Sequence, residues 1–439
     1  MDGAHQILLF VVVLGSMFAL LAAGVWIGIT LLISGYLAIE FFSPAPSGSL
    51  LASTVWDGSW PWTLTALPLF VWMGEILFRT RLSEDMFVGM SPWLRWLPGR
   101  LLHVNIIGCA IMSAITGSSA VCSATVGRMS VPELRKRGYD EFMAIGTLSG
   151  SGTLGMLIPP SIMMMVYGVI AQVSIGQLFI AGVGPGIMMM LMYQGYVIVW
   201  AKLFPSRQPP ADPPMSLGQM LWASRRLIPA MILILIVLGS IYGGLATPTE
   251  AAVFGVIGSL AFSAAQGTLT WQSFQDGLVQ TVKTTCMITL ILAGGNFLSI
   301  ALGFTGLPQM MAGWSAGWGL DKWSLLVVLT ILYIILGTAL DGASMILLTA
   351  AVVLPMVSAA GIDLLWFGIY MMIVTEMSQI SWPVGFCLFV VQSLTGCTLN
   401  EVSLATLPFM IMLIIGIVLI AIFPEIVLWL PQQMVNKPG

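Results

Sequence analysis

Long apolar runs follow one another along the whole chain, separated by short polar segments. About 20 apolar residues span a bilayer as a helix, so a chain of 439 residues allows roughly a dozen membrane-crossing elements. Composition agrees, since 58% of the residues are hydrophobic and only 8% are charged, against roughly 25% charged in soluble domains. We therefore predict an all-α polytopic membrane protein. A soluble enzyme with a single anchor is excluded, and without a basic tail we expect no nucleic-acid partner.

The positive charges predict how the chain crosses the membrane. Twelve of the 15 Lys and Arg residues lie in 79–100, 128–137 and 202–226, and cytoplasmic loops collect such residues. If the first two regions share one side, the segment 101–131 must enter and leave by the same face. It is too short for two spans, each of about 20 residues. We therefore predict a re-entrant helical hairpin, with the small and hydroxyl residues around 116–124 at its turn.

The next segment, 142–171, has to cross the membrane once. Its centre contains Pro159 and Pro160, which remove backbone donors and restrict the preceding residue. A broken helix is therefore expected here. Segment 177–201 would return the chain to the cytoplasm, and the Pro-rich stretch 205–214 is the best candidate for a linker.

The second half of the chain repeats the first at an offset of 223 residues. This shift aligns five pairs of punctuating residues: Pro132 with Pro355, Gly138 with Gly361, Asp140 with Asp363, Pro160 with Pro383, and Pro185 with Pro408. After the linker we expect spans at 227–245, 248–265 and 284–305. The hairpin at 324–354 then enters from outside, so the two repeats are inverted. Paired broken segments in inverted halves are typical of secondary transporters.

Seven sequence strings, in order, resemble one known family. The chain is similar to the large membrane (permease) subunit of tripartite ATP-independent periplasmic (TRAP) transporters, over nearly its whole length. The strings are LTALPLFVWMGEIL (64–77), TGSSAV (116–121), VPELRKRGYD (131–140), GTLGMLIPPSIMMMVYGV (152–169), SIGQLFIAGVGPGI (174–187), ATPTEAA (246–252) and LDGASMILLTAAVVLPM (340–356).

The resemblance implies a sodium-driven importer of the bacterial inner membrane and not an enzyme. Two hairpins and two broken helices would form a mobile, elevator-type transport domain of the ion transporter superfamily, and the other helices a scaffold. The expected partners are a small four-helix membrane subunit, a periplasmic binding protein, and a small organic anion, either a carboxylate or another anionic solute. No cofactor is expected besides sodium as the coupling ion.

These implications divide the chain into five parts. The first scaffold helices and a cytoplasmic amphipathic segment occupy 1–100, and the first transport half occupies 101–201. The cytoplasmic linker is 202–226, the second scaffold helices are 227–323, and the second transport half with the final helix is 324–439.

Sodium needs about five or six oxygens, which unwound carbonyls and hydroxyls can supply inside a membrane. In the first half, Ser118 and Ser119 at the hairpin tip would face carbonyls of Gly155, Ile158 and Pro160. In the second half, Asp341 and Gly342 would face Ser378, Ser381 and Pro383. The four tip residues are also expected to meet the solute, because half-helix N-termini suit anions. Such small residues can alternatively serve close helix packing.

Asp341 is the most informative single residue. An ionised carboxylate inside a membrane costs on the order of 2.5–3.5 kcal/mol on insertion scales, so a cation is a natural partner. It can also cap the following half-helix, and the two roles are compatible. The family's second broken helix usually reads TPPVG, whereas this chain has Trp382 in place of the first proline.

The sequence has two alternative interpretations. A carrier of the same fold could work without a binding protein. An intramembrane hydrolase would need Ser118 or Ser119 within reach of His103 as base, and His103 lies 15 residues before Ser118, near the cytoplasmic end of the hairpin.

Thr247, Pro248 and Glu250 are expected to start a helix as N-cap, first-turn proline and first-turn acid.

Overall fold

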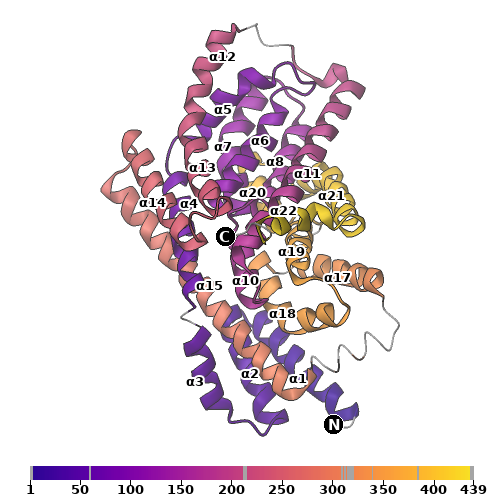
Figure 1. The fold of residues 1–439 in the computed structure, drawn as a ribbon. Coiled ribbons are helices and arrows are strands. Elements are labelled where there is room, and N and C mark those ends of the chain that lie inside the picture. Colours follow the sequence, from indigo (N-terminus) through magenta and orange to yellow (C-terminus); the bar gives the residue numbers. More distant parts are fainter. Residues whose placement is uncertain are drawn as a thin grey trace.

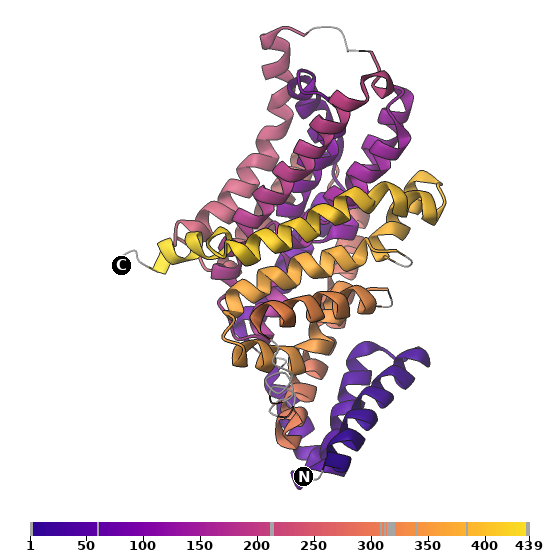
Figure 2. The same cartoon turned by 90° about the vertical axis from the view of Figure 1, so that its right-hand side faces the viewer.

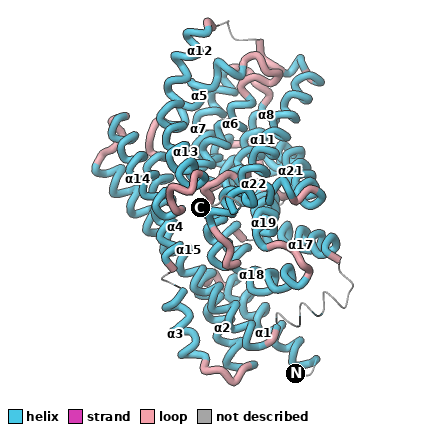
Figure 3. The backbone as a smooth tube through the Cα atoms, viewed as in Figure 1, coloured by secondary structure: helices cyan, strands magenta, loops and turns pink. Residues whose placement is uncertain are grey.

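The structure is a computed structural model that describes residues 3–58, 61–210, 215–307, 310, 313, 321–338, 340–382 and 385–435. The described residues form helices joined by short loops, without a strand (Figure 3). Six helices are long and apolar enough to cross a membrane, or up to eight if each of two bent pairs is one span. The predicted all-α membrane fold is thereby confirmed.

The first repeat contains the predicted hairpin and broken helix. The hairpin consists of α6 (Leu102–Thr116) and α7 (Ser119–Lys136). The broken helix consists of α8 (Glu141–Gly152), the short α9 (Leu154–Leu157) and, after a bend of 40°, α10 (Ile162–Ile170). The return helix is α11 (Ile175–Leu203).

The second repeat has the same order of elements. Its hairpin is α17 (Lys322–Leu336) and α18 (Gly342–Ala359). The broken helix is α19 (Leu364–Gln379) and α20 (Phe386–Thr395), followed by α21 (Leu399–Ile422) and α22 (Glu425–Val435). In Figure 1 the first hairpin lies in the upper part of the molecule and the second in the lower part, as expected for hairpins that enter from opposite sides.

Local details confirm the 223-residue offset. Gly138 and Gly361 both have left-handed φ values, +74° and +70°, which glycine adopts without steric cost. Asp140 and Asp363 both cap the next helix, accepting hydrogen bonds from Met143 N and Trp366 N. The same local sequence therefore starts the broken helix in each half.

The remaining helices flank these repeats. They are α1 (Gly3–Ala22), α2 (Ile27–Phe42), α3 (Ser47–Gly58), η1 (Trp62–Thr65), α4 (Ala66–Phe78), α5 (Leu82–Leu94), η2 (Pro205–Arg207), α12 (Leu217–Ser224), η3 (Arg225–Leu227), α13 (Ile228–Tyr242), α14 (Pro248–Ala265) and α15 (Trp271–Thr305). Helix α15 packs along both α2 and α4. Figure 2 shows the N-terminal helices at the lower end of the molecule, beside α15.

Two of these flanking helices begin with a capping box. Thr247 and Glu250 form a capping box at the start of α14, with Pro248 in the first turn, as predicted. Helix α15 begins at Trp271, earlier than the predicted span at 284–305, because Thr270 and Ser273 form a capping box there. The extra N-terminal turns carry Asp276 and Lys283, so apolar length alone did not indicate where the helix begins.

Candidate functional site

The tip of the first hairpin lies against the break of the first broken helix. Gly117 ends α6 with a φ of +60°, and a Cβ atom there would lie 2.6 Å from the carbonyl oxygen of Pro160. A Cβ on Gly155 would collide with the backbone of Ser118 and Ser119. Because only glycine allows these approaches, the tip and the break are held in direct contact.

The helix break leaves backbone carbonyls without intrahelical donors. An α-helical carbonyl accepts from the N–H four residues later, and proline has no N–H. Pro159 and Pro160 therefore release the carbonyls of Gly155 and Met156. Ile158 has an extended backbone, with φ −87° and ψ 121°, and its side chain packs on Gly186 of α11. The structure thus brings Ser118, Ser119, Gly155 and Pro160 together. Ile158 lies at the same break with its side chain on α11, and the predicted role of its carbonyl stays a prediction.

The two tip serines differ in their surroundings. Ser118 is half-buried and precedes α7 without capping it through its side chain. Ser119 is 1% exposed, and its hydroxyl donates a hydrogen bond to Oε1 of Glu376 in α19. Ser119 is therefore fixed from the opposite half of the molecule.

The tip of the second hairpin is organised by Asp341. Its Oδ2 accepts from Ala343 N at 3.2 Å, and its Oδ1 accepts from the Ser344 hydroxyl. The predicted capping of α18 is confirmed. A Cβ on Gly342 would lie 2.6 Å from Nε2 of Gln379 and 2.9 Å from Cγ2 of Thr375, so this tip also packs on its broken helix.

The serine hydroxyls at the second break donate hydrogen bonds to nearby backbone carbonyls. Ser378 donates to Thr375 O at 2.6 Å, and Ser381 donates to Ser378 O at 2.8 Å. Ser378 also packs on Gly337, at the end of α17. Pro383 lies outside the described residues. Ser378 and Ser381 are thus linked by a hydrogen bond, and Gly342 packs on Gln379, the residue next to Ser378.

Sequence analysis missed Glu376. It lies in the apolar stretch at the end of α19 and is fully buried. Besides the Ser119 hydroxyl, its Oε1 accepts a hydrogen bond from Met156 N at 3.0 Å. Glu376 therefore links the second half to both the hairpin tip and the broken helix of the first half. The signal was present, because an acid within an apolar segment is as costly as Asp341.

The hydrolase alternative does not fit this geometry. His103 sits at the start of α6 and its Nε2 lies 2.8 Å from the carbonyl oxygen of Pro98. Ser119 follows the other end of this 15-residue helix, which is about 22 Å long at 1.5 Å per residue. A nucleophile and a base must lie within hydrogen-bond reach, so these residues do not form such a pair.

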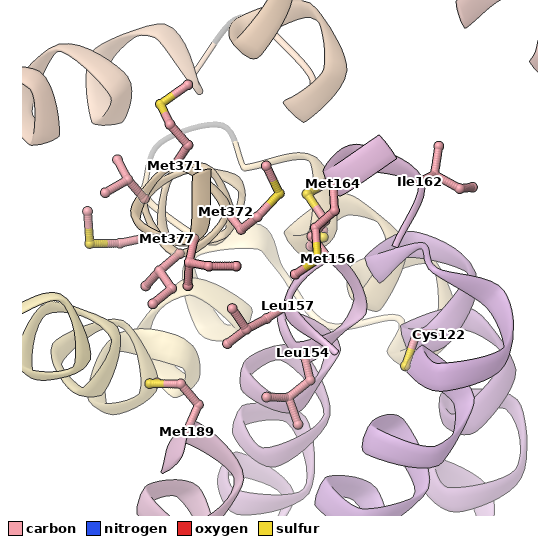
Figure 4. Packing of buried hydrophobic residues seen from close by; sticks show 14 of the residues in the cluster. Cys122, Leu154, Met156, Leu157, Ile162, Met164, Met189, Met371, Met372 and Met377 are labelled. Atoms are coloured by element: carbon pink, nitrogen blue, oxygen red, sulfur yellow. The ribbon is translucent and has the colours of Figure 1, made fainter. Parts of the chain in front are cut away.

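Buried methionines pack between the two halves behind the site. Figure 4 shows Met156 and Leu157 of α9 beside α19, which carries Met372 and Met377. All four residues are at most 6% exposed. Methionine fills irregular gaps between helices, and this packing holds the two broken helices together.

Comparison with known proteins points to one family. The family model described as tripartite ATP-independent periplasmic transporter, DctM component, matches residues 14–426. The C4-dicarboxylate TRAP transporter large permease protein of Pseudomonas aeruginosa is 32% identical, covering 92% of this chain and 93% of that protein. The sialic acid TRAP transporter large permease protein of Vibrio cholerae is 28% identical, covering 95% and 98%.

The fold resembles a solved transporter. The YdaH transporter of Alcanivorax borkumensis superposes with a TM-score of 0.60 over 85% of this chain and 87% of that one, at 13% sequence identity. At this identity the likeness concerns the fold alone. It agrees with the arrangement of hairpins and broken helices described above.

Proposed function

We propose that this chain, which belongs to the family of large membrane (DctM) subunits of tripartite ATP-independent periplasmic transporters, imports a small organic anion together with sodium. As a member of this family, it is a polytopic transport protein of the bacterial inner membrane. The observation that carries this proposal is the contact between hairpin tip and helix break in both halves. In the first half the contact joins the tip serines to Gly155 beside the break, and in the second it joins Gly337 and Gly342 to Ser378 and Gln379 at the end of α19. Hydroxyls and unwound carbonyls are the ligands that a cation site in a membrane uses.

The first sodium site is proposed at the tip of α6–α7. Ser118 and Ser119 would supply hydroxyl oxygens, and Gly155, Ile158 and Pro160 would supply carbonyls. Support comes from the close packing of Gly155 on the serines and of Pro160 on Gly117. Sodium is a hard cation and prefers such oxygen ligands.

The second sodium site is proposed at the tip of α17–α18. Asp341 would add a carboxylate, with Gly342, Ser378, Ser381 and Pro383 around it. The carboxylate of Asp341 is half-buried and accepts hydrogen bonds at both oxygens, which leaves lone pairs for a cation, since an ionised carboxylate has about four acceptor positions.

The solute would bind between the two tips. Helices α7 and α18 begin at Ser119 and Gly342, and their N-terminal N–H groups and dipoles favour negative charge. Ser118, Ser119, Asp341 and Gly342 are the proposed contacts. Relatives named for C4-dicarboxylates and for sialic acid support a carboxylate as the first solute to test.

The transport cycle is proposed to be of the elevator type. The mobile part would comprise 101–201 and 324–439, and the scaffold 1–100 and 227–323, joined by the linker 202–226. Sodium must bind the solute-loaded arrangement better than the empty one, and by reciprocity the solute then strengthens sodium binding. The partners would be a small membrane subunit and a periplasmic binding protein, in keeping with a tripartite family.

Uptake into proteoliposomes tests the proposal. The chain is reconstituted with the small membrane protein that a neighbouring gene encodes. Labelled C4-dicarboxylate and labelled sialic acid are then supplied, each with and without the binding protein and with and without an inward sodium gradient. We expect uptake only when both are present. Uptake that needs sodium but no binding protein would establish an autonomous carrier instead, and uptake indifferent to sodium would overturn the coupling.

A further inference from the structure

One carboxylate of the second half contacts both the hairpin tip and the broken helix of the first half. Glu376 of α19 accepts the hydroxyl hydrogen of Ser119 and the N–H of Met156 on the same oxygen, Oε1. Ser119 begins α7 at the hairpin tip, and Met156 lies in α9, one residue after Gly155. Glu376 is therefore next to the proposed first sodium site, although it lies more than 200 residues further along the chain.

The carboxyl group of Glu376 has no cationic partner among the residues that the structure describes. Its side chain is fully buried, the ion pairs found there involve other acids, and its second oxygen, Oε2, makes no hydrogen bond. A buried carboxylate is costly unless it is paired. A cation bound nearby would offset this cost.

The hydrogen bond from Ser119 also sets the direction of its hydroxyl. A hydroxyl has one hydrogen and two lone pairs. Because the hydrogen points to Glu376, the lone pairs remain available on the other sides of the oxygen. A carboxylate that holds a ligand in this way is the counterpart of the carboxylates that orient metal-binding histidines.

The two halves differ in where their acid comes from. The second tip carries its own acid, Asp341, and the equivalent position of the first tip is Ser118. The position equivalent to Glu376 in the first half is Thr153, whose hydroxyl bonds to Gly150 O and Tyr193 Oη at 2.6 and 2.9 Å. Each proposed site thus has one carboxylate beside it, and in the first site that carboxylate is supplied by the other repeat.

We propose that Glu376 is a positioning residue of the first sodium site, which orients the Ser119 hydroxyl and supplies the negative charge that the first hairpin lacks. The inference rests on the proposed sodium coupling and adds a residue to it. It also links the halves, since sodium at the first tip would stabilise the packing of α19 against α7 and α9.

The decisive variant is Glu376→Gln, which keeps the size and the accepting oxygen and removes the charge. The purified chain is heated in detergent over a series of sodium concentrations, with choline holding the ionic strength constant. We expect the half-saturating sodium concentration to rise about 10- to 100-fold, the range for partners of metal ligands. Without sodium, the variant should unfold at the wild-type temperature or above it, because it carries no unpaired buried charge. Ser149→Ala, which removes a buried, unpartnered hydroxyl of α8, is the matched control and should match the wild type.

A second variant covers the case in which Glu376→Gln does not fold. Glu376→Asp keeps the charge but shortens the reach to Ser119, and it should raise half-saturating sodium by a smaller factor. Wild-type sodium dependence in either folded variant would overturn the proposal and leave the proposed function intact. If sodium neither stabilised the wild-type protein nor drove its uptake of solute, both the role of Glu376 and the proposed function would be overturned.

Discussion

The side-chain amide of Gln379 lies 3.8 Å from Sδ of Met156, and these residues are 223 positions apart, the offset of the repeat. A residue can touch its own equivalent only near the axis that relates two repeats. The pseudo-twofold axis therefore passes between α9 and α19, at the helix breaks. This places the two candidate sites close to the centre of symmetry, where inverted-repeat transporters bind their solutes.

The packing of Gly155 on Ser119 can be tested by adding one methyl group. Gly155→Ala would force Cβ into the backbone of the tip, and overpacking of this kind costs about 1–3 kcal/mol. We expect a lower midpoint of thermal unfolding. Gly195→Ala in α11 is the control, because nothing lies within 4 Å of its Cβ. Equal midpoints for both variants would show that the tip does not rest on Gly155.

Asp341 is expected to serve both the helix cap and the ion. Asp341→Asn retains a capping side chain and loses the charge, so the amount of folded protein should stay near wild type while sodium-dependent uptake falls. Asp341→Ala also loses the cap, which costs about 0.5–2 kcal/mol. Folded yield and uptake against sodium concentration are measured together. Unchanged sodium dependence in Asp341→Asn would remove Asp341 from the site.

The elevator division predicts that α4 and α6 slide past each other. A Cβ on Gly74 of α4 would lie 3.3 Å from Cα of Thr116 in α6, close enough for a disulfide between cysteines at these positions. Oxidising the Gly74→Cys/Thr116→Cys variant should stop uptake, and a reductant should restore it. Each single-cysteine variant carries the same native thiols and is the control. Full uptake by the crosslinked protein would argue that these helices move together.

The start of α14 offers a test of stability away from the site. Thr247 accepts from Glu250 N, and Glu250 Oε2 accepts from Thr247 N at 2.8 Å. Thr247→Ala should lower stability by about 0.5–2 kcal/mol, as for other lost N-caps, with sodium dependence unchanged. The effect is measured as the midpoint of thermal unfolding. Thr249→Ala, which changes a threonine of the same turn that is not the N-cap, is the control. A loss of sodium dependence would connect this loop to the transport cycle.

The sequence by itself determined the class of fold and its internal repeat. Apolar length and scarce charge require a membrane, and glycine and proline act locally, so Gly138 and Gly361 or Pro159 and Pro160 indicate turns and breaks without knowledge of the rest. The basic clusters required the first segment to fold back as a hairpin. Because these local signals mark the turns and breaks, the residues of both tips and both breaks could be proposed as site residues from the sequence.

Only the tertiary structure decided which of these residues meet. Periodicity predicts which face of a helix is buried, but the partner of a buried residue depends on how distant helices pack. The carboxylate of Glu376 reaches Ser119 and Met156 across the two halves, and the side chain of Ile158 turns to α11. Neither contact has a local signature, because both depend on the packing of helices that lie far apart in the chain.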